Sequence, residues 1–330
     1  MTLDQLGWSA LKQKEFAVHA ALGLVPGRVV SEHRSHYQVA TDVGEVSAGT
    51  SGRIRNTAGE RSELPGVGDF VAVRLSGGDG PATIDTVLPR STALVRKASS
   101  ENRPQLLAAN IDVVLIVTAV AGDFNLERIG RYLALVRESG AAPVIVLNKS
   151  DLASDLAGPL GELTALAPGV PIHAISARAA DSIRDIAQYF DGNRTVVLVG
   201  SSGVGKSTLT NQLLGHVVQA TQEVRAHDSR GRHTTTHRQL FVRAQGGSLI
   251  DTPGLRGLEL WNAAVPESKF DDIVVLATQC KFSNCRHANE PGCAVRAAVA
   301  SGDLDAARAA DFANIPRPSA EWAKGSRRRT

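Results

Sequence analysis

The residues with the clearest chemical potential form a glycine-rich stretch after the apolar run 195–199. The stretch Gly200-Ser201-Ser202-Gly203-Val204-Gly205-Lys206-Ser207-Thr208 fits the pattern G-x-x-x-x-G-K-[ST]. Glycines let backbone N–H groups wrap an anion, and a helix starting there points its positive end at phosphates. We expect Lys206 to contact the β- and γ-phosphates of a nucleotide and the Ser207 hydroxyl to bind Mg²⁺. The alternative, a turn that binds nothing, fits this strand-to-helix context poorly.

A second polar segment indicates which base is bound. Asn148-Lys149-Ser150-Asp151 follows the apolar run 143–147 and fits N-K-x-D. An Asp151 carboxylate accepts from N1–H and the 2-amino group of guanine, a donor pair that adenine lacks. Asn148 can pair with the other edge of the base, and the stem of Lys149 can lie along the purine ring. These residues predict a preference for GTP over ATP.

A third segment, Ser176-Ala177, follows the next apolar run, 172–175, where a backbone N–H could meet guanine O6. Neither this dipeptide nor N-K-x-D is decisive alone. Ligand sites in parallel α/β sheets form at the carboxyl ends of strands, and all three segments start at such ends. We therefore interpret them as one guanine-nucleotide site.

Two further loops contain candidates for sensing the γ-phosphate. Asp251-Thr252-Pro253-Gly254 follows the apolar run 248–250, so Asp251 can hold Mg²⁺ through its hydration shell and the Gly254 N–H can sense the γ-phosphate. Upstream lies the polar loop Gly231-Arg232-His233-Thr234-Thr235-Thr236. Either Thr235 or Thr236 is placed to coordinate Mg²⁺, and such loops order with the triphosphate.

The residue after Gly254 is Leu255, where many GTPases carry a glutamine that orients the attacking water. Leucine has no polar atom for this task. His233 is a candidate for it, as is help from a bound partner. The alternative interpretation of His233 is an exposed loop histidine.

The order of the motifs differs from that of ordinary GTPases. N-K-x-D at 148 and Ser-Ala at 176 precede the phosphate loop at 200, whereas they ordinarily follow it. The same sheet forms from either order if nearby termini are joined and the chain is opened elsewhere, which domains tolerate. We predict a circularly permuted GTPase domain whose switch segments lead directly into the C-terminal region.

All three cysteines lie close together, at Cys280, Cys285 and Cys293, with His287 between them. Three thiolates and one imidazole complete a tetrahedral Zn²⁺ shell with no open position, so we predict one structural zinc site. Glu290 could compete with His287 as the fourth ligand. The alternative is a coincidental cluster of buried cysteines. Three cysteines cannot all pair, which favours a metal in a reducing compartment over disulfides.

The elements around these residues predict a multidomain α/β protein. Residues 1–25 indicate a helical lead-in, and 26–92 contain short β-rich runs broken by glycines, typical of an OB-like barrel, although an SH3-like barrel would look almost the same. Residues 90–104 resemble a connector. We assign 104–262 to the GTPase domain because its apolar runs are continuous, and 263–330 to a helical zinc-binding domain with a basic tail. The strands expected in the GTPase domain are 113–117, 144–147, 172–175, 196–199 and 248–250.

Charge and hydropathy exclude some classes of protein. The net charge of +3 is too small to indicate a nucleic-acid partner, but residues 281–330 contain nine Lys/Arg against five Asp/Glu. That tail is either a solvated end or an RNA contact. The first residues lack the pattern of a signal peptide, and no apolar run reaches the ~18 residues of a membrane span. We expect a cytoplasmic protein without a membrane partner.

Taken together, these motifs resemble the ribosome small subunit-dependent GTPase A family of circularly permuted bacterial GTPases. The resemblance rests on five segments: Asn148 to Asp151, Gly200 to Thr208, Gly231 to Thr236, Asp251 to Gly254, and the Cys280/Cys285/His287/Cys293 set. It implies an OB-fold barrel, a GTPase with a hydrophobic residue in place of the catalytic glutamine, and a zinc domain. It further implies late 30S maturation, contact with 16S rRNA, and release on GTP hydrolysis to GDP.

Two other interpretations remain open at this stage. One is a nucleotide-gated RNA-binding module whose hydrolysis is incidental, which the missing glutamine favours. The other is a P-loop metabolic kinase, which the guanine-reading segment 148–151 disfavours. For all three we expect a monomer.

Overall fold

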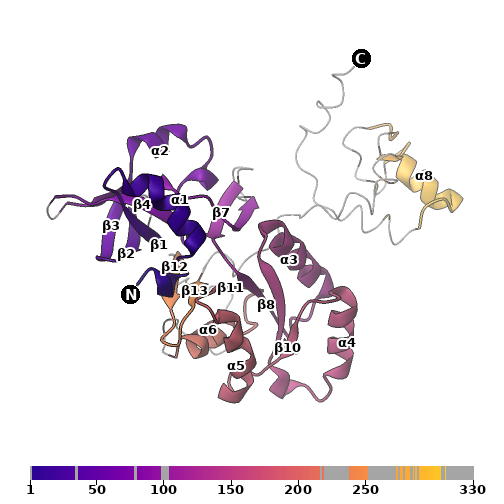
Figure 1. Cartoon of the computed structure of the whole chain (residues 1–330). Coiled ribbons are helices and arrows are strands. Elements are labelled where there is room, and N and C mark those ends of the chain that lie inside the picture. Colours follow the sequence, from indigo (N-terminus) through magenta and orange to yellow (C-terminus); the bar gives the residue numbers. More distant parts are fainter. Residues whose placement is uncertain are drawn as a thin grey trace. The chain divides into compact units, whose positions relative to one another are not determined.

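The structure is a computed structural model of the 330-residue chain. It describes residues 2–33, 36–77, 80–97, 104–215, 218, 238–251, 273, 276–277, 279–282, 285, 287, 290–305 and 309. The chain divides into two compact units, Met1–Glu259 and Leu260–Thr330. In the first unit a β-barrel is joined to an α/β sheet (Figure 1).

The barrel is built from the first five strands of the described chain. They pair in the order β1-β2-β3-β5-β4, and β4 pairs back onto β1, so the barrel is closed. β3 and β5 run parallel, whereas the other neighbouring strands are antiparallel. This is the five-stranded OB arrangement, so the predicted OB-like barrel is confirmed. The strands are β1 (Val25–His33), β2 (His36–Thr41), β3 (Gly44–Thr50), β4 (Phe70–Arg74) and β5 (Ala82–Val87).

Short helices surround the barrel. A 3-10 turn, η1 (Asp4–Leu6), and helix α1 (Ala10–Ala20) precede it, as the expected helical lead-in. Phe16 of α1 and Trp8 pack edge-on, and Trp8 meets Phe70 of β4 in the same way. The α1 helix therefore closes over the apolar face of β4. Between β3 and β4 the chain forms α2 (Gly52–Thr57) and η2 (Arg61–Glu63).

The α/β part contains the strands predicted from continuous apolar runs. The strands β10, β9, β8, β11 and β13 lie side by side and parallel, and their central members are buried on both faces. All five predicted strands are thereby confirmed. Their bounds are β8 (Val113–Ala119), β9 (Ala142–Asn148), β10 (Ile172–Ala174), β11 (Thr195–Val199) and β13 (Ser248–Asp251).

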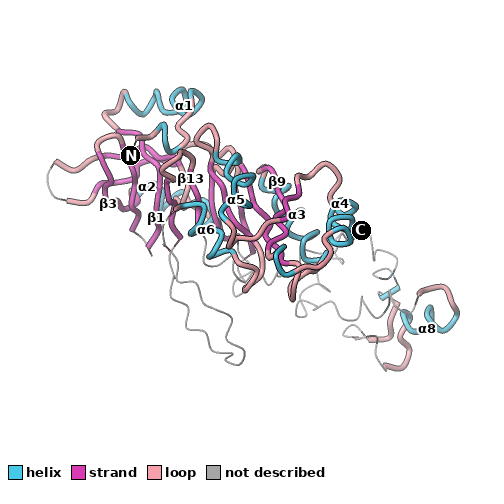
Figure 2. Tube along the Cα trace, turned by 90° about the horizontal axis from the view of Figure 1, so that it is seen from below, coloured by secondary structure: helices cyan, strands magenta, loops and turns pink. Residues whose placement is uncertain are grey.

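Helices cover this sheet (Figure 2). α5 and α6 contribute Ile183, Ile186, Leu209 and Leu213 to one buried core with β8 and β11, while α3 packs on β8 and β9 and contacts α4. The helices are α3 (Leu126–Ser139), α4 (Ala157–Leu166), α5 (Ala180–Ala187) and α6 (Lys206–Leu214), with the 3-10 turns η3 (Ser150–Leu152) and η4 (Gln188–Phe190).

Two features differ from the sequence-based expectation. The segment 90–104, interpreted as a connector, contains strand β6 (Ala93–Lys97), which pairs with β7 (Pro104–Ala109). Strand β6 is short and ends in Arg96 and Lys97, so its apolar pattern is weak. A further strand, β12 (Arg238–Val242), lies antiparallel between β13 and barrel strand β1. Through it, the five barrel strands and the five parallel strands form one eleven-stranded sheet in the described part of the chain.

A buried arginine also fastens the barrel to the α/β sheet. Arg28 of β1 donates to the Gly68 carbonyl at 3.0 Å, to the Thr195 hydroxyl at 2.9 Å and to the Asn110 carbonyl at 3.0 Å. Its guanidinium stacks on Phe70, and burial lowers its pKa to about 10. Because Thr195 begins the strand that leads to the phosphate loop, the barrel is fixed to the base of that strand.

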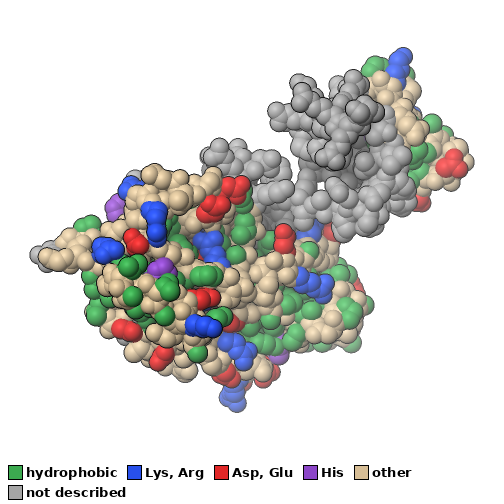
Figure 3. All heavy atoms as spheres, turned by 45° about the horizontal axis from the view of Figure 1, so that its top comes forward, with side chains coloured by type: hydrophobic (Ala, Val, Ile, Leu, Met, Phe, Trp, Pro, Cys, Tyr) green, Lys and Arg blue, Asp and Glu red, His purple; other side chains and the backbone are tan. Residues whose placement is uncertain are grey.

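The described part of the second unit centres on the cysteine cluster and helix α8 (Ala294–Ser301). On the face drawn in Figure 3, acidic and basic side chains of the described residues are interspersed rather than gathered by sign. None of the helices in the described part of the chain has the length and apolar character that a membrane crossing requires. The division at 25, 92, 104 and 262 stays a prediction.

Candidate functional site

The phosphate loop connects β11 to α6 through backbone conformations that need glycine. Gly200 has φ +143°, and a Cβ there would lie 2.1 Å from the Val117 carbonyl oxygen of β8. Gly205, the N-cap of α6, has φ +99°, and a Cβ there would lie 2.2 Å from Nδ2 of Asn148. Both positions therefore exclude any side chain. Gly203, with φ +82°, has open space around it.

Lys206 is the first residue of α6 and turns back over the loop. Its Nζ donates to the Gly200 carbonyl at 2.5 Å and to the Ser201 carbonyl. The ammonium is thus held inside the curve of the loop, where the prediction places the phosphates. Ser207 and Thr208 follow in the first helical turn, both half-buried. A positive charge, a helix N-terminus and a hydroxyl converge there, as an anion with a hard cation requires.

Asn148, at the end of β9, joins the three segments that the sequence analysis assigned to one site. Its Nδ2 donates to the Val204 carbonyl of the phosphate loop at 2.7 Å. Its Oδ1 accepts from the Ala177 N–H at 2.9 Å. The side chain is 2% exposed, so both bonds are shielded from water. Asn148 therefore has a positioning role in this structure, and its contact with the base stays a prediction.

Asp151 is the exposed acid of this group and lies beside Ser176. A hydrogen bond with the Ser176 side chain lowers the pKa of the Asp151 carboxyl, against the effect of desolvation, and the charges of Arg178 and Lys149 lower it further. The carboxyl is therefore an ionised acceptor at neutral pH, as guanine N1–H and N2–H₂ require. Lys149 adopts the left-handed φ of +61°, uncommon for a residue with a side chain. Ser150 donates its N–H to the Ile175 carbonyl at 3.0 Å.

Of the candidates near the γ-phosphate, the structure describes Asp251. It is the last residue of β13, half-buried, on the strand next to β11. It therefore lies at the same sheet edge as the phosphate loop. The other candidates, Gly254, His233, Thr235 and Thr236, lie outside the described residues, as does Leu255.

Two residues near the site were not predicted. Tyr132 of α3 is 2% exposed and hydrogen-bonds the Ser201 side chain, and burial raises its pKa. Arg178, exposed two positions after Ser176, contributes positive charge at Asp151. Its place directly after Ser-Ala could have indicated it. No sequence pattern marks Tyr132, because a tyrosine in an amphipathic helix usually packs in the core.

In the second unit, Cys280, Cys285, His287 and Cys293 form the predicted cluster, with one donor atom each and all within 4.8 Å of one another. Sγ of Cys280 lies 3.6 Å from Nδ1 of His287 and 3.9 Å from Sγ of Cys293, and the last two donors are 3.3 Å apart. Tetrahedral bonds of about 2.3 Å to sulfur and about 2.0 Å to nitrogen imply donor separations of about 3.5–3.8 Å. The donors thus fit a tetrahedral metal, and the cluster contains His287 rather than Glu290.

The thiols differ in how readily they ionise. Burial raises the pKa of Cys280, but the N–H groups of Val295 and Ala294 at the start of α8 lower it together with hydrogen bonds from the other two thiols, so the net shift is downward. Burial raises the pKa of the Cys285 thiol to about 11. Metal binding must therefore displace at least the Cys285 proton at neutral pH.

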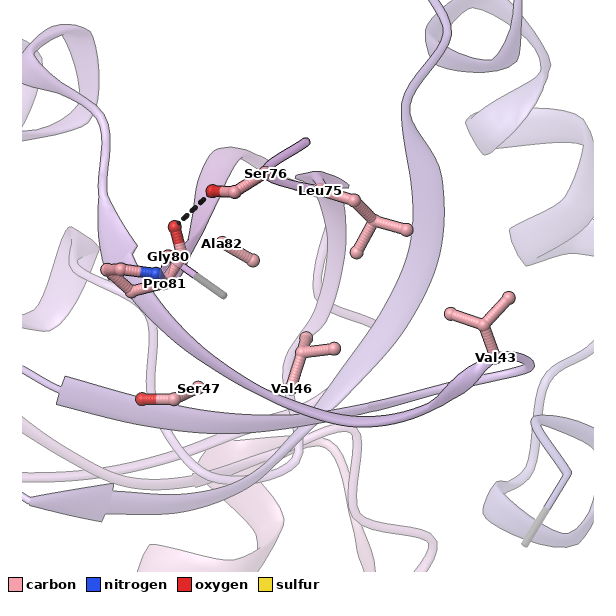
Figure 4. A pocket seen from close by; sticks show the side chains of 8 residues that line it. All are labelled: Val43, Val46, Ser47, Leu75, Ser76, Gly80, Pro81 and Ala82. Atoms are coloured by element: carbon pink, nitrogen blue, oxygen red, sulfur yellow. Dashed lines mark hydrogen bonds between the residues drawn. The ribbon is translucent and has the colours of Figure 1, made fainter. Parts of the chain in front are cut away.

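The barrel also carries a pocket of about 550 Å³ whose lining contains none of the predicted site residues (Figure 4). Val43, Val46 and Leu75 supply most of its apolar wall, and the Ser76 hydroxyl donates to the Pro81 carbonyl at 2.6 Å. None of the eight lining residues is titratable, so the pocket offers no acid–base chemistry. The other lining residues are Ser47, Gly80, Pro81 and Ala82.

Comparison with known proteins agrees with the motifs. A family model described as RsgA GTPase matches residues 87–261. The small ribosomal subunit biogenesis GTPase RsgA of Opitutus terrae is 43% identical over 336 residues, covering 98% of this chain and 91% of that protein. This chain belongs to the RsgA GTPase family. A second relative, the small ribosomal subunit biogenesis GTPase RsgA of Streptomyces coelicolor, is 42% identical, covering 96% of this chain and 86% of that protein.

Two solved structures of similar fold support the same assignment. YjeQ from Thermotoga maritima superposes with a TM-score of 0.56 at 28% identity, covering 88% of this chain and 97% of that one. YloQ, described as a circularly permuted GTPase, gives 0.52 at 25% identity, covering 89% and 97%. As an RsgA family member the protein is a GTPase, and the permuted fold predicted from motif order is confirmed.

Proposed function

We propose that this protein hydrolyses GTP as a maturation factor of the small ribosomal subunit. The observation that carries the proposal is the Asn148 side chain, which ties the phosphate loop and the Ser-Ala segment to the guanine-reading motif. The relatives named above are small ribosomal subunit biogenesis GTPases. A nucleotide-binding protein with those relatives acts in the cytoplasm, where subunits are assembled, and we expect it to act as a monomer.

In the proposed reaction, the phosphate-loop N–H groups and Lys206 hold the transferred phosphate and stabilise the charge that develops on its oxygens. Mg²⁺ would be held by the Ser207 hydroxyl, by Asp251 through water, and by Thr235 or Thr236. These are oxygen donors, which Mg²⁺ prefers. When bound, it neutralises charge on the phosphates. Asp151, with Ser176 and Ala177, selects guanine.

The attacking water needs a polar group that Leu255 cannot supply. We assign this role to His233, with the ribosomal subunit as an alternative source. The Gly254 N–H contacts the γ-phosphate in this scheme. Hydrolysis would change the conformation of the loops that flank β12 and β13. The protein would then be released from the ribosomal subunit.

The barrel and the second unit would contact 16S rRNA. Tyr37 of β2 is 4% exposed, so it does not offer its ring for base stacking. Contacts with RNA phosphates by exposed arginines such as Arg53 fit better, and such binding weakens steeply with salt. In the second unit one structural Zn²⁺ fits the Cys3His donors, and the basic excess of 281–330 would face rRNA.

The test is GTP turnover with and without purified 30S subunits, on the zinc-loaded full chain. We expect strong stimulation by 30S, and none in the Lys206→Ala variant because its phosphate cradle loses the ammonium. An Arg184→Ala variant, which removes an exposed ion pair with Asp181, is the matched control. Subunit binding with unchanged turnover would instead indicate the nucleotide-gated RNA-binding module.

A further inference from the structure

Strand β1 pairs with β2 along one edge, but on its other edge the neighbour changes partway along the strand. Its first part, Val25 to Arg28, pairs with β4 and closes the barrel. Beyond an irregularity between Val29 and Ser31, residues Ser31 and Glu32 pair with β12. Bulges bend a strand and increase its twist, which explains how the same edge of β1 pairs first with β4 and then with β12. The second half of β1 is thus part of the GTPase sheet.

The strand that β1 reaches lies beside Asp251. Gln239 of β12 pairs in register with Ser31 on one side and with Asp251 on the other. Asp251, which is proposed to hold Mg²⁺ through water, is therefore one strand away from the barrel. The β1–β12 ladder contains only two residue pairs, against four in the β12–β13 ladder. Because two residue pairs give few backbone hydrogen bonds, we expect side-chain contacts to stabilise the pairing of β1 with β12.

Arg238, the first residue of β12, makes those contacts. Its Nη1 lies 3.4 Å from Oε2 of Glu32, its partner in the ladder, and donates to the Leu106 carbonyl of β7 at 2.9 Å. Both charged side chains are only 18% exposed. One guanidinium thus holds β12 to the barrel and to the β6–β7 hairpin. Neither Arg238 nor Glu32 belongs to a nucleotide-binding motif.

We propose that Arg238 is a positioning residue for Asp251: by fixing β12 to Glu32 and β7, it sets where β13 ends and where the Asp251 carboxylate lies. Mg²⁺ requires near-ideal octahedral geometry, so a small displacement of the carboxylate that holds its water ligands lowers its affinity. The proposal rests on the proposed function in one respect, the role of Asp251 at Mg²⁺. It adds that the barrel supports metal binding without touching the nucleotide.

The experiment uses the full zinc-loaded chain with a fluorescent non-hydrolysable GTP analogue. The rate of analogue release is measured across a Mg²⁺ titration, together with the Mg²⁺ dependence of turnover and the melting temperature. Arg238→Ala should raise the half-saturating Mg²⁺ concentration about 10-fold, the lower end of the loss typical for supporting partners of metal ligands. Arg238→Lys should recover part of it, because it keeps the charge but not both contacts. Glu32→Gln, a milder change that retains the shape, should give a smaller shift in the same direction.

Two comparisons make the outcome decisive. Arg184→Ala removes an exposed arginine of α5 that pairs with Asp181 at 2.6 Å, and it should leave the Mg²⁺ dependence unchanged. A lower melting temperature in Arg238→Ala and Glu32→Gln with unchanged Mg²⁺ dependence would overturn the proposal, because the pair would then only stabilise the fold. Asp251→Asn separates the two hypotheses: if it also leaves Mg²⁺ dependence unchanged, the proposed role of Asp251 fails. If it alone raises the Mg²⁺ requirement, only the positioning role of Arg238 fails.

Discussion

The phosphate loop and the metal centre differ in what holds their functional groups in place. At the loop, Lys206 is bound to two carbonyls and Asn148 to two neighbouring segments, within a sheet covered by helices. At the metal centre, four donor atoms face one another within 4.8 Å, beside a small apolar cluster around Ile273, Val295 and Leu304. The first site is thus held in place by contacts within the protein, whereas we expect the second to depend on a bound metal.

The largest expected effect comes from removing that ligand. In Cys285→Ser the tetrahedral set loses one thiolate, and structural zinc contributes on the order of 10–16 kcal/mol in small zinc-dependent domains. We expect loss of bound zinc and of amide-exchange protection in α8, while GTP binding persists because every proposed nucleotide contact lies in the first unit. Zinc per chain and hydrogen exchange measure this.

The matched control is Ala297→Ser, an exposed position on α8 outside the donor set. It should keep both zinc and protection. A zinc-free Cys285→Ser protein with undiminished protection would mean that the apolar cluster holds the second unit by itself. Loss of GTP binding in the same variant would contradict the independence of the two sites.

The next prediction concerns the phosphate loop and a substitution that its backbone conformation cannot accommodate. Gly200→Ala places a Cβ 2.1 Å from a backbone carbonyl that cannot move without disturbing β8. Overpacking costs about 1–3 kcal/mol, and the left-handed φ adds a similar cost, so GTP affinity should fall at least ~30-fold. Calorimetric titration with GTP measures it. Gly161→Ala in α4, which meets nothing within 4 Å, is the control and should bind normally; zinc content should stay full in both.

The parts of the fold and of the candidate site that could be predicted from the sequence are those formed by residues close together in the chain. The phosphate loop and the Cys3His set follow from residue types at short spacing. Strand β12 and its pairing with β1 could not be predicted in this way. The register between distant strands depends on side chains such as Arg238 and Glu32, which look like solvent-exposed charges in the sequence. For the same reason Arg28 gave no sign that it is buried. From the sequence, Asn148 was expected to contact the base. Its hydrogen bond to the Val204 carbonyl, 56 positions along the chain, could be seen only in the structure.

A smaller effect is expected at the base-reading acid. Asp151→Asn presents a donor where guanine has donors, and unpaired polar groups cost about 1–3 kcal/mol each, so GTP affinity should fall by roughly 10- to 100-fold. Xanthine, which has an acceptor at that edge, should bind better than before. Competition among GTP, XTP and ATP measures this, with Asp181→Asn, an exposed acid of α5, as control. Unchanged preference for GTP would remove Asp151 from the base-reading role and leave guanine selection without an assigned acid.

The smallest expected effect tests whether pre-organisation of the loop depends on single polar contacts. Tyr132→Phe removes the hydroxyl that reaches Ser201 and keeps the buried ring. A hydrogen bond of this kind contributes about 1 kcal/mol, so GTP affinity should fall about 2- to 5-fold.

Tyr189→Phe is the matched control for this change. It loses a hydroxyl bonded to His173 at 2.7 Å, away from the phosphate loop. Both variants lose one hydrogen bond, so their melting temperatures should fall by similar amounts, and only Tyr132→Phe should weaken GTP binding. Equal GTP affinity in the two would show that the backbone contacts of Lys206 and Asn148 suffice to shape the loop, which would widen the contrast with a metal centre that fails when one donor is lost.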